Sequence, residues 1–235
     1  MLTRRHHEPL PRLDGRTAVV TGADTGIARA TADGLLALGA TVHVVDRRDV
    51  SLLADVRAYA ATWTVRPDIL IHAAGVRPPR RVETAEGHEL TFAVHVLGPH
   101  LLTKLLRPAR RVIWVSSAVM YTRRLRLDDL EALDYSPARA YARTKRMQVA
   151  LAREWGERVG GTAIHSTYST PRRGADTILW LAAAAKPGLS TGRLWFDRAP
   201  RREHYLPCTR ESAAERAALW DAVDALVTSP PRDRG

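Results

Sequence analysis

The chain has 235 residues, is 45% hydrophobic and 26% charged, and carries a net charge of +11, which is typical of one globular domain. No apolar run approaches the roughly 18 residues that a membrane helix needs. Cys208 is the single cysteine, so an intramolecular disulfide is excluded, and the nine histidines lack the spacing of a structural zinc site. Its positive charge lies mainly in arginine pairs scattered along the whole chain without a nucleic-acid motif, so we expect no nucleic-acid partner.

The two ends of the chain differ from the rest. Residues 1–12 are basic and contain Pro9 and Pro11 instead of the apolar segment of a secretory signal. We expect a flexible arm over residues 1–12, a folded domain over 13–228 and a disordered tail over 229–235. This organisation predicts a cytoplasmic protein.

Between these ends, short β-branched runs alternate with longer helical stretches, a pattern typical of a parallel sheet covered by helices. The predicted strands are Thr17–Thr21, Thr41–Asp46, Asp68–Ala74, Arg111–Ser116, Thr162–His165 and Arg193–Phe196. The predicted helices are Ile27–Leu38, Ser51–Thr62, Glu86–Leu106, Ala138–Val159, Gly174–Ala185 and Ser212–Leu226. The pattern predicts an α/β fold with a doubly wound parallel sheet in a single domain.

A glycine-rich segment closes the first predicted strand and opens the first helix. In this segment, Thr21–Ala28, glycines allow a tight turn close to a diphosphate, and the helix N-terminus offers free N–H groups. Asp46 ends the second strand twenty residues beyond Gly26, where a carboxylate can accept hydrogen bonds from ribose hydroxyls. Together they indicate a Rossmann-type dinucleotide fold.

Three motifs resemble those of the short-chain dehydrogenase/reductase (SDR) family, in the family's order. They are Thr-Gly-x-x-x-Gly-Ile at residues 21–27, Val115-Ser116-Ser117 at a strand end, and Tyr141-x-x-x-Lys145. Segments 86–92 and 98–103 resemble the retinol-dehydrogenase-like branch. Segments 115–151 and 174–180 are most similar to the subgroup named dehydrogenase/reductase family member twelve.

The resemblance implies a catalytic set of Ser117, Tyr141 and Lys145. Tyr141 would exchange a proton with a carbonyl or alcohol oxygen, which Ser117 would polarise. Lys145 lies one helical turn after Tyr141, so its positive charge would lower the pKa of the phenol, and its ammonium would hold the nicotinamide ribose.

The resemblance also implies a set of cofactor-binding residues. These are Thr21, Gly22, Asp24, Thr25, Gly26, Ile27, Asp46, Arg47, Asp49, Val50, Ala74 and Gly75, together with Tyr141 and Lys145. Asp46 would repel the 2′-phosphate of NADP, whereas Arg47 and Arg48 could pair with it. The cofactor is therefore NAD or NADP, with NAD favoured.

Three positions depart from the family pattern. Ala28 replaces the third glycine of the cofactor loop, and Ala73 replaces an asparagine that ties down a strand end. His95 stands where the family has an asparagine that kinks the long helix and holds a proton-relay water. A packed, hydrogen-bonded histidine and a functional one are both open, since histidine titrates near neutrality.

Two segments of the family are missing. After Asp46 the chain goes almost directly to Asp49 and Val50, so the third strand at the sheet edge and its helix are expected to be absent. After His165 only Ser166–Pro171 precede the next helix, which leaves out the substrate lid. We expect the second strand to form the edge of the sheet and the reactive end of the cofactor to be loosely held.

Two functional classes follow from these observations. The first is an NAD(P)-dependent oxidoreductase that acts on a small-molecule carbonyl/alcohol pair. The second is a descendant without hydride transfer, either a non-redox acid/base catalyst or a non-catalytic protein. Helices 86–106 and 138–159 resemble those through which many SDR proteins dimerise, so a homo-oligomer is also considered.

Overall fold

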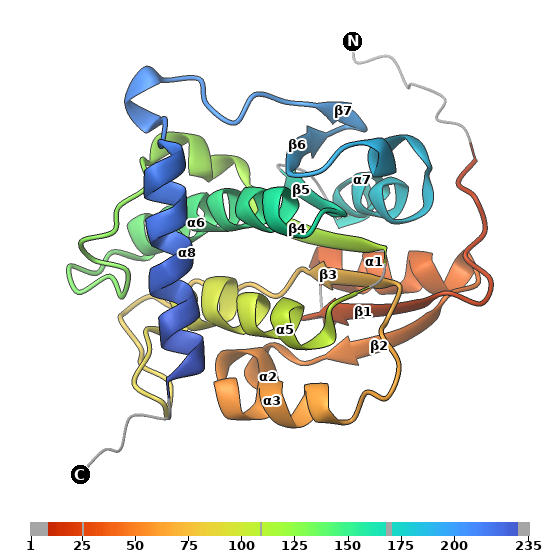
Figure 1. Cartoon of the computed structure of the whole chain (residues 1–235), viewed down its shortest axis with the longest axis horizontal. Coiled ribbons are helices and arrows are strands. Elements are labelled where there is room, and N and C mark those ends of the chain that lie inside the picture. The colour runs from red at the N-terminus through yellow and green to blue at the C-terminus, as the bar shows by residue number, and fades with distance from the viewer. Residues whose placement is uncertain (1–8, 25, 109, 168–170, 230–235) are drawn as a thin grey trace.

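A single sheet organises the structure, a computed structural model that describes residues 9–24, 26–108, 110–167 and 171–229. The strand order is β2-β1-β3-β4-β5-β6-β7, with helices on both faces (Figure 1). The strands are β1 Thr17–Thr21, β2 Thr41–Val45, β3 Ile69–His72, β4 Arg111–Ser117, β5 Thr162–Thr167, β6 Arg193–Phe196 and β7 Ala199–Pro200. Most of the expected flexible arm and tail, 1–8 and 230–235, lies outside the described residues.

Strands β1 to β6 are parallel, which confirms the predicted α/β fold. Strand β7 was not predicted, and it pairs antiparallel with β6 through a two-residue turn. Asp197 and Arg198 in this turn have φ angles of 51° and 55°. Their sequence lacks the Asn-Gly or Asp-Gly pair that normally marks such a hairpin.

The prediction that the third family strand is missing is confirmed, because all of residues 46–68 are described and none forms a strand. Strand β2 is therefore the edge of the sheet. The single helix expected over 51–62 is instead two helices, α2 Arg47–Ser51 and α3 Leu53–Ala61. Asp46 starts α2 by accepting a hydrogen bond from the Arg48 N–H, and Leu52 is extended between the two helices.

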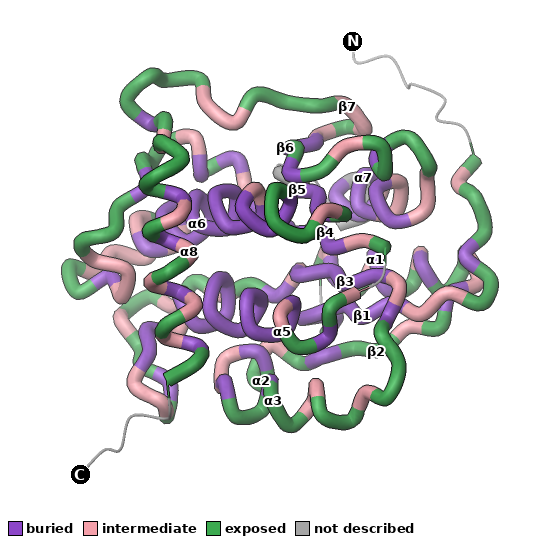
Figure 2. The backbone as a smooth tube through the Cα atoms, in the orientation of Figure 1, coloured by how far each residue is buried: buried purple, intermediate pink, exposed green. Residues whose placement is uncertain are grey.

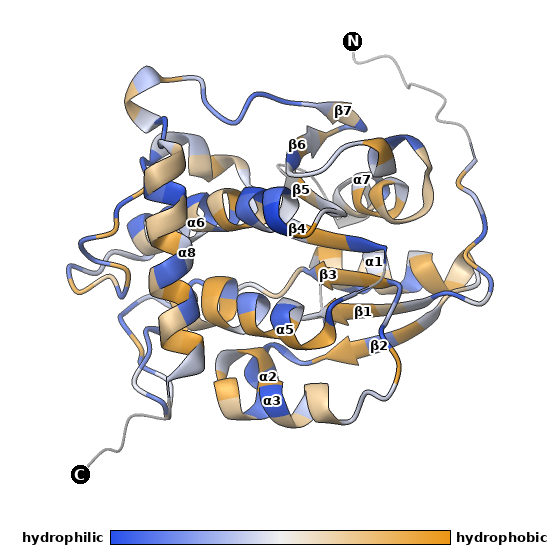
Figure 3. Ribbon diagram, viewed as in Figure 1, coloured by the Kyte–Doolittle hydropathy of each residue, from blue (hydrophilic) through white to orange (hydrophobic). Residues whose placement is uncertain are grey.

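Helices on the two faces of the sheet bury separate apolar clusters. Helices α1 Gly26–Ala37 and α7 Pro171–Ala183 cover one face. Helices α3, α5 Gly98–Leu106 and α6 Pro137–Arg158 cover the other, and α8 Ala213–Thr228 packs outside α5 and α6. Figure 2 shows the central strands buried between these layers, and Figure 3 shows the hydrophobic residues along β1 and β4.

The long helix before β4 begins later than predicted, at Leu90 instead of Glu86. Gly87 has a φ of 81° in a turn, and the Glu89 side chain then caps the helix by accepting hydrogen bonds from the N–H groups of Thr91 and Phe92. The helix has three parts, which are α4 Leu90–Phe92, the π-helical η1 Ala93–Leu97, and α5. The remaining short turns are η2 Ala118–Thr122, η3 Lys186–Leu189 and η4 Pro207–Thr209.

Helix α8 packs across α5 and α6, the two helices considered above for dimerisation (Figure 1). Its buried side chains Leu219, Val223 and Val227 belong to the same apolar cluster as those of α5 and α6. Part of the surface of these helices is therefore already covered within one chain.

Over the described part of the chain, no helix combines the length and apolar character needed to cross a bilayer.

Helix α2 contacts the start of α5 at Gly98. A Cβ added at Gly98 would lie 2.1 Å from the carbonyl oxygen of Val50 and 2.7 Å from its Cγ1. The Val50 side chain is fully buried at this contact. A glycine at residue 98 therefore allows the short segment that replaces the missing strand to close against the domain.

We predict that Gly98→Ala lowers the free energy of unfolding by about 1–3 kcal/mol, because a backbone oxygen must move to admit the methyl group. Chemical denaturation of the variant and the parent protein measures the change. Leu105→Ala, at an exposed position of the same helix, should stay within about 0.5 kcal/mol. A gain in stability for Gly98→Ala, as helix propensity alone would produce, would contradict this packing.

Candidate active site

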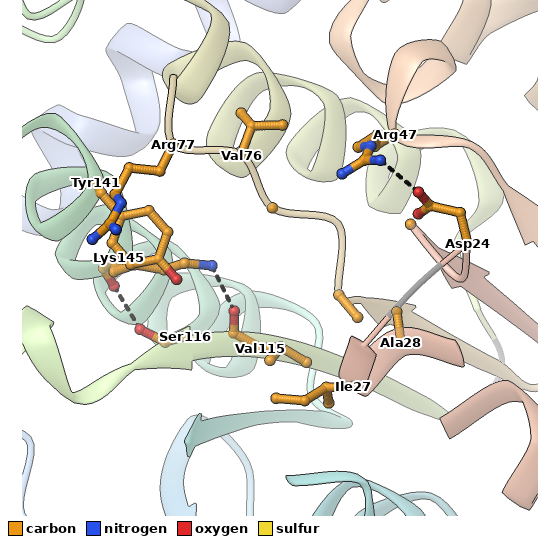
Figure 4. Close-up of a pocket in the computed structure, with 13 residues that line it drawn as sticks. Asp24, Ile27, Ala28, Arg47, Val76, Arg77, Val115, Ser116, Tyr141 and Lys145 are labelled. Carbon is orange, nitrogen blue, oxygen red and sulfur yellow. Dashed lines mark hydrogen bonds and ion pairs between the residues drawn. The ribbon is translucent and has the colours of Figure 1, made fainter. Parts of the chain in front are cut away.

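A cavity of about 290 Å³ lies where the carboxyl ends of β1, β3 and β4 meet the start of α1 (Figure 4). This is the place where open parallel sheets bind ligands. The lining residues come from five parts of the chain and are Gly22, Asp24, Ile27, Ala28, Arg47, Ala73, Gly75, Val76, Arg77, Val115, Ser116, Tyr141 and Lys145. The fold thus brings the glycine-rich loop and the Tyr-Lys pair to one cavity.

The glycine-rich loop has the conformation that its sequence predicts. Gly22 has a φ of 72°, and a Cβ there would lie 2.6 Å from the Cα of Ala74. Gly26, the first residue of α1, has a φ of 61°. The two glycines therefore permit the close turn that leads into the helix N-terminus. Thr25, another predicted cofactor residue, lies outside the described residues.

Thr21 ties down the strand end at which the family asparagine is missing. Its Oγ1 accepts hydrogen bonds from the N–H groups of Ala73 and Ala74, both at 3.1 Å. Thr21 and Ala74 are both buried behind the cavity, so neither lines it. A hydroxyl group from β1 thus holds the loop after β3 in place.

Tyr141 and Ser117 approach each other beside the cavity. Burial raises the pKa of Tyr141, whereas a hydrogen bond with Ser117 and the positive charge of Arg77 act in the opposite direction. The net direction is upward, so the phenol is protonated at neutral pH. Arg77 is the cation that favours the phenolate in this structure, and the expected effect of Lys145 on the Tyr141 pKa stays a prediction.

The Lys145 ammonium is buried, and its hydrogen-bond acceptors are a backbone carbonyl and a glutamine side chain. Its Nζ donates hydrogen bonds to the carbonyl oxygen of Val115 at 2.9 Å and to Oε1 of Gln148 at 3.0 Å (Figure 4). Nζ lies 5.4 Å from the centre of the Tyr141 ring. Burial lowers the pKa of Lys145 to about 7, because both partners are neutral and no carboxylate compensates for the lost hydration.

Gln148 connects Lys145 to the π-helical segment. Its Nε2 donates a hydrogen bond to the carbonyl oxygen of His95 at 2.9 Å. In an α-helix this oxygen would accept from residue 99, but Pro99 has no N–H and its ring would clash with that carbonyl. The chain forms a π-turn here, and the side chain of Gln148 satisfies the oxygen.

His95 is a packed histidine in this structure. Its Nε2 accepts from the Val76 N–H at 3.1 Å, and its Nδ1 lies 2.8 Å from the Oγ1 of Thr144. Burial, assisted by the positive charge of Lys145, lowers the pKa of His95 well below its ordinary value. The ring is therefore neutral and holds the loop after β3 against α6.

The predicted ribose-binding residues have other partners in this structure. One oxygen of Asp46 accepts from the Arg48 N–H, and Asp46 does not line the cavity. Arg47 forms an ion pair of 2.6 Å with Asp24 across the mouth of the loop. Asp49 is exposed on α2, and Val50 is buried against Gly98, so neither lines the cavity.

Six lining residues were not among the predicted site residues. Ala28 and Ala73 had been noted only as departures from the family pattern, and Val76, Arg77, Val115 and Ser116 were missed. The sequence could have indicated the last four, because Val76 and Arg77 follow β3 closely and Val115 and Ser116 lie at the end of β4. Ser116 does not face a substrate, because its hydroxyl donates to the carbonyl oxygen of Lys145 at 2.8 Å. Arg77 is the most consequential omission, since it is exposed beside Tyr141 and affects its pKa.

Comparison with known proteins identifies the family. A sequence profile of the NAD dependent epimerase/dehydratase family matches residues 18–203. Dehydrogenase/reductase SDR family member 12 of Bos taurus is 30% identical over 278 aligned residues, which cover 92% of this chain and 87% of the relative. The chain belongs to the short-chain dehydrogenase/reductase family. The resemblance inferred from the motifs is thereby confirmed.

Other SDR similarities agree with this assignment. Retinol dehydrogenase 14 of Homo sapiens is 26% identical over 92% of this chain and 86% of the relative. A protein from Mycobacterium paratuberculosis of solved structure has a TM-score of 0.81 at 25% identity, covering 95% of this chain and 97% of that one. The alignment with the bovine SDR protein has 278 positions, so more than forty of them have no residue in this 235-residue chain.

The connection after β5 is one place where this SDR chain is short. Strand β5 ends at Thr167 and α7 begins at Pro171, and the joining residues 168–170 lie outside the described residues. Three residues cannot form the substrate-covering segment that the family pattern places there.

We predict that Lys145 titrates with a pKa near 7, which makes stability depend on pH. Its pKa is lowered in the folded protein, so between about pH 7 and pH 10 the unfolded chain binds more protons and stability rises with pH. Below pH 7 both states are protonated and this contribution to the slope vanishes. The parent protein should therefore gain stability relative to Lys145→Met as pH rises from 7 to 9, by at most about 1.4 kcal/mol per pH unit.

Denaturation at several pH values measures this difference. Lys186→Met, which removes an exposed lysine, is the matched control and should show no such pH-dependent difference. If the free energies of unfolding of the parent protein and Lys145→Met change equally with pH across this range, the Lys145 pKa is not lowered.

Proposed function

We propose that the protein is a nicotinamide-dependent oxidoreductase that interconverts a carbonyl compound and an alcohol through Ser117, Tyr141 and Lys145. The observation that carries the proposal is the meeting of Tyr141 and Ser117 beside a cavity that the glycine-rich loop also lines. Neither motif would be useful to a reductase without the other. SDR family membership supports the same reaction class.

The residues around the cavity fit a dinucleotide. The positive φ angles of Gly22 and Gly26 leave room for a diphosphate at the N-terminus of α1. The Lys145 ammonium has only neutral partners and could be shared with ribose hydroxyls. When bound, a nicotinamide cofactor supplies or accepts the hydride. NAD stays our favoured cofactor, because Arg47 is paired with Asp24 and Asp46 carries a negative charge near the loop.

The protonation state of Tyr141 favours reduction of a carbonyl compound. Because its pKa is raised, the phenol holds a proton that it can transfer to a carbonyl oxygen. The Ser117 hydroxyl would orient that oxygen by a hydrogen bond, and Arg77 would stabilise the phenolate left behind. Proton transfer in the opposite direction, from an alcohol, would be favoured at higher pH.

A protein without hydride transfer is the second candidate. It is favoured by the short β5–α7 connection and by the small volume of the cavity, which lies at the lower limit for ligand pockets. In that case Tyr141 would serve as an acid/base group in a non-redox reaction, or the cavity would bind a ligand without reaction. Nucleotide binding and turnover discriminate between these functions.

We expect Tyr141→Phe to lower turnover by roughly 100-fold or more while the protein keeps its stability, because the ring remains and only the proton donor is lost. The measurement is oxidation of NADH or NADPH with the reactive dicarbonyl 9,10-phenanthrenequinone. Tyr205→Phe, at an exposed tyrosine, is the control and should turn over like the parent protein. An unchanged rate for Tyr141→Phe would remove Tyr141 from the mechanism.

We also expect the adenosine diphosphate half of the cofactor to supply most of the binding energy, because the connection between β5 and α7 is too short for the segment that would hold the nicotinamide. ADP-ribose should bind within about tenfold of NAD, or about 1.4 kcal/mol, by titration calorimetry. Tighter binding of NAD by more than about a hundredfold would reveal a complete nicotinamide pocket. If neither NAD nor NADP binds at millimolar concentration, the oxidoreductase proposal fails.

A further inference from the structure

A second cavity lies at the amino ends of the central strands, whereas the candidate active site lies at their carboxyl ends. It measures about 690 Å³, compared with about 290 Å³ for the first. Its walls include the starts of β4 and β5, at Val112 and Thr162, whereas the first cavity is lined by the end of β4. The carboxyl ends of α5 and α6 and one side of α8 complete it. Its volume is typical of pockets that bind small organic molecules.

Aromatic rings form one wall of this second cavity. Trp155 of α6 and Trp220 of α8 both line it, with ring centres 4.8 Å apart. The His100 ring packs against both, at 5.3 Å and 4.7 Å, and its Nδ1 accepts a hydrogen bond from the Trp155 indole. Burial lowers the pKa of His100 to about 4, so this ring is uncharged at neutral pH, and the Arg158 guanidinium lies 4.5 Å from the centre of the Trp220 ring. The wall therefore suits a flat apolar group.

Positive charge surrounds the opening. Arg66, Arg107 and Arg110 line the cavity, are exposed, and form no ion pair among the described residues. Asp224 is the one acidic residue in the lining, and it is already paired with Lys104 at 2.6 Å. The pKa of the neighbouring Arg111 is lowered by burial first and by the charge of Arg110 second. An anion would relieve this repulsion among cations.

The helix carboxyl ends and the backbone conformation of Arg107 also affect the opening of this cavity. The carboxyl ends of α5 and α6 each contribute about half a negative charge, which offsets only part of three full positive charges. Arg107 ends α5 in the left-handed conformation, with a φ of 43°, where glycine is the less strained residue. The net potential at the opening is positive, and an arginine occupies a strained position beside it.

We propose that the second cavity binds an amphipathic organic anion, with an apolar body against Trp155 and Trp220 and an acidic group between Arg107 and Arg110. The occupant is a small molecule that carries a carboxylate, sulfonate or phosphate group. This proposal does not depend on the proposed oxidoreductase function, because the two cavities share no residue.

The test uses 2-naphthalenesulfonate as the probe and the indole ¹H–¹⁵N signals of the folded protein as the readout. Trp155→Phe and Trp220→Phe assign their two signals. We expect these signals to shift saturably, while those of Trp63, Trp114, Trp180 and Trp195 stay in place. The uncharged 2-naphthalenesulfonamide should bind at least tenfold more weakly.

Charge reversal supplies the second arm of this test. Arg110→Glu should weaken sulfonate binding at least tenfold, whereas Arg123→Glu, which reverses an exposed arginine that lines neither cavity, should change it less than twofold. Melting temperatures check that both variants fold. Equal binding of sulfonate and sulfonamide, equal binding by Arg110→Glu and the parent protein, or displacement of the probe by ADP-ribose would each overturn the proposal.

Discussion

The ammonium group of Lys145 is buried, and much of the structure around the site follows from the need to satisfy it. Its two acceptors belong to the end of β4 and to the next turn of α6. Gln148 can serve as one acceptor because its amide group is held by the carbonyl oxygen of His95. That oxygen is free because Pro99 offers no N–H. One proline thus shapes a π-turn that supports a charged group on another helix.

The same network reaches the glycine-rich loop. His95 holds the Val76 N–H on one side and Thr144 of α6 on the other. Thr21 holds the two residues that follow β3, and Gly22 packs against one of them. The loops that would contact a cofactor are therefore connected by hydrogen bonds to the helix that carries Tyr141. Such connections limit the freedom of the residues that line this small cavity.

Loss of the third family strand is compensated by local packing. The five residues of α2 lie where a longer crossover would otherwise run, and their contact with Gly98 closes the domain at its β2 edge. Asp46 begins this helix as its cap, which engages one carboxylate oxygen. The short connection therefore determines the environment of Asp46, because the residue that follows β2 is also the N-cap of α2.

The parallel sheet and part of the candidate site could be predicted from the amino-acid sequence, although Asp46, Asp49 and Val50 do not line the cavity. Alternating β-branched and helical runs predicted the parallel strands, and the resemblance to the SDR family predicted that β2 forms the sheet edge. The same resemblance implied that Gly22, Tyr141 and Lys145 serve one site, and all three line one cavity. The runs themselves are local, because each depends on residues close together in the chain, whereas the meeting of Gly22 with Tyr141 was expected only from the family resemblance. Only the tertiary structure decided the partners of Lys145, the pKa direction of Tyr141, the capping role of Asp46 and the existence of a second cavity. Each of these depends on burial and on contacts between elements far apart in the sequence, which no local pattern records.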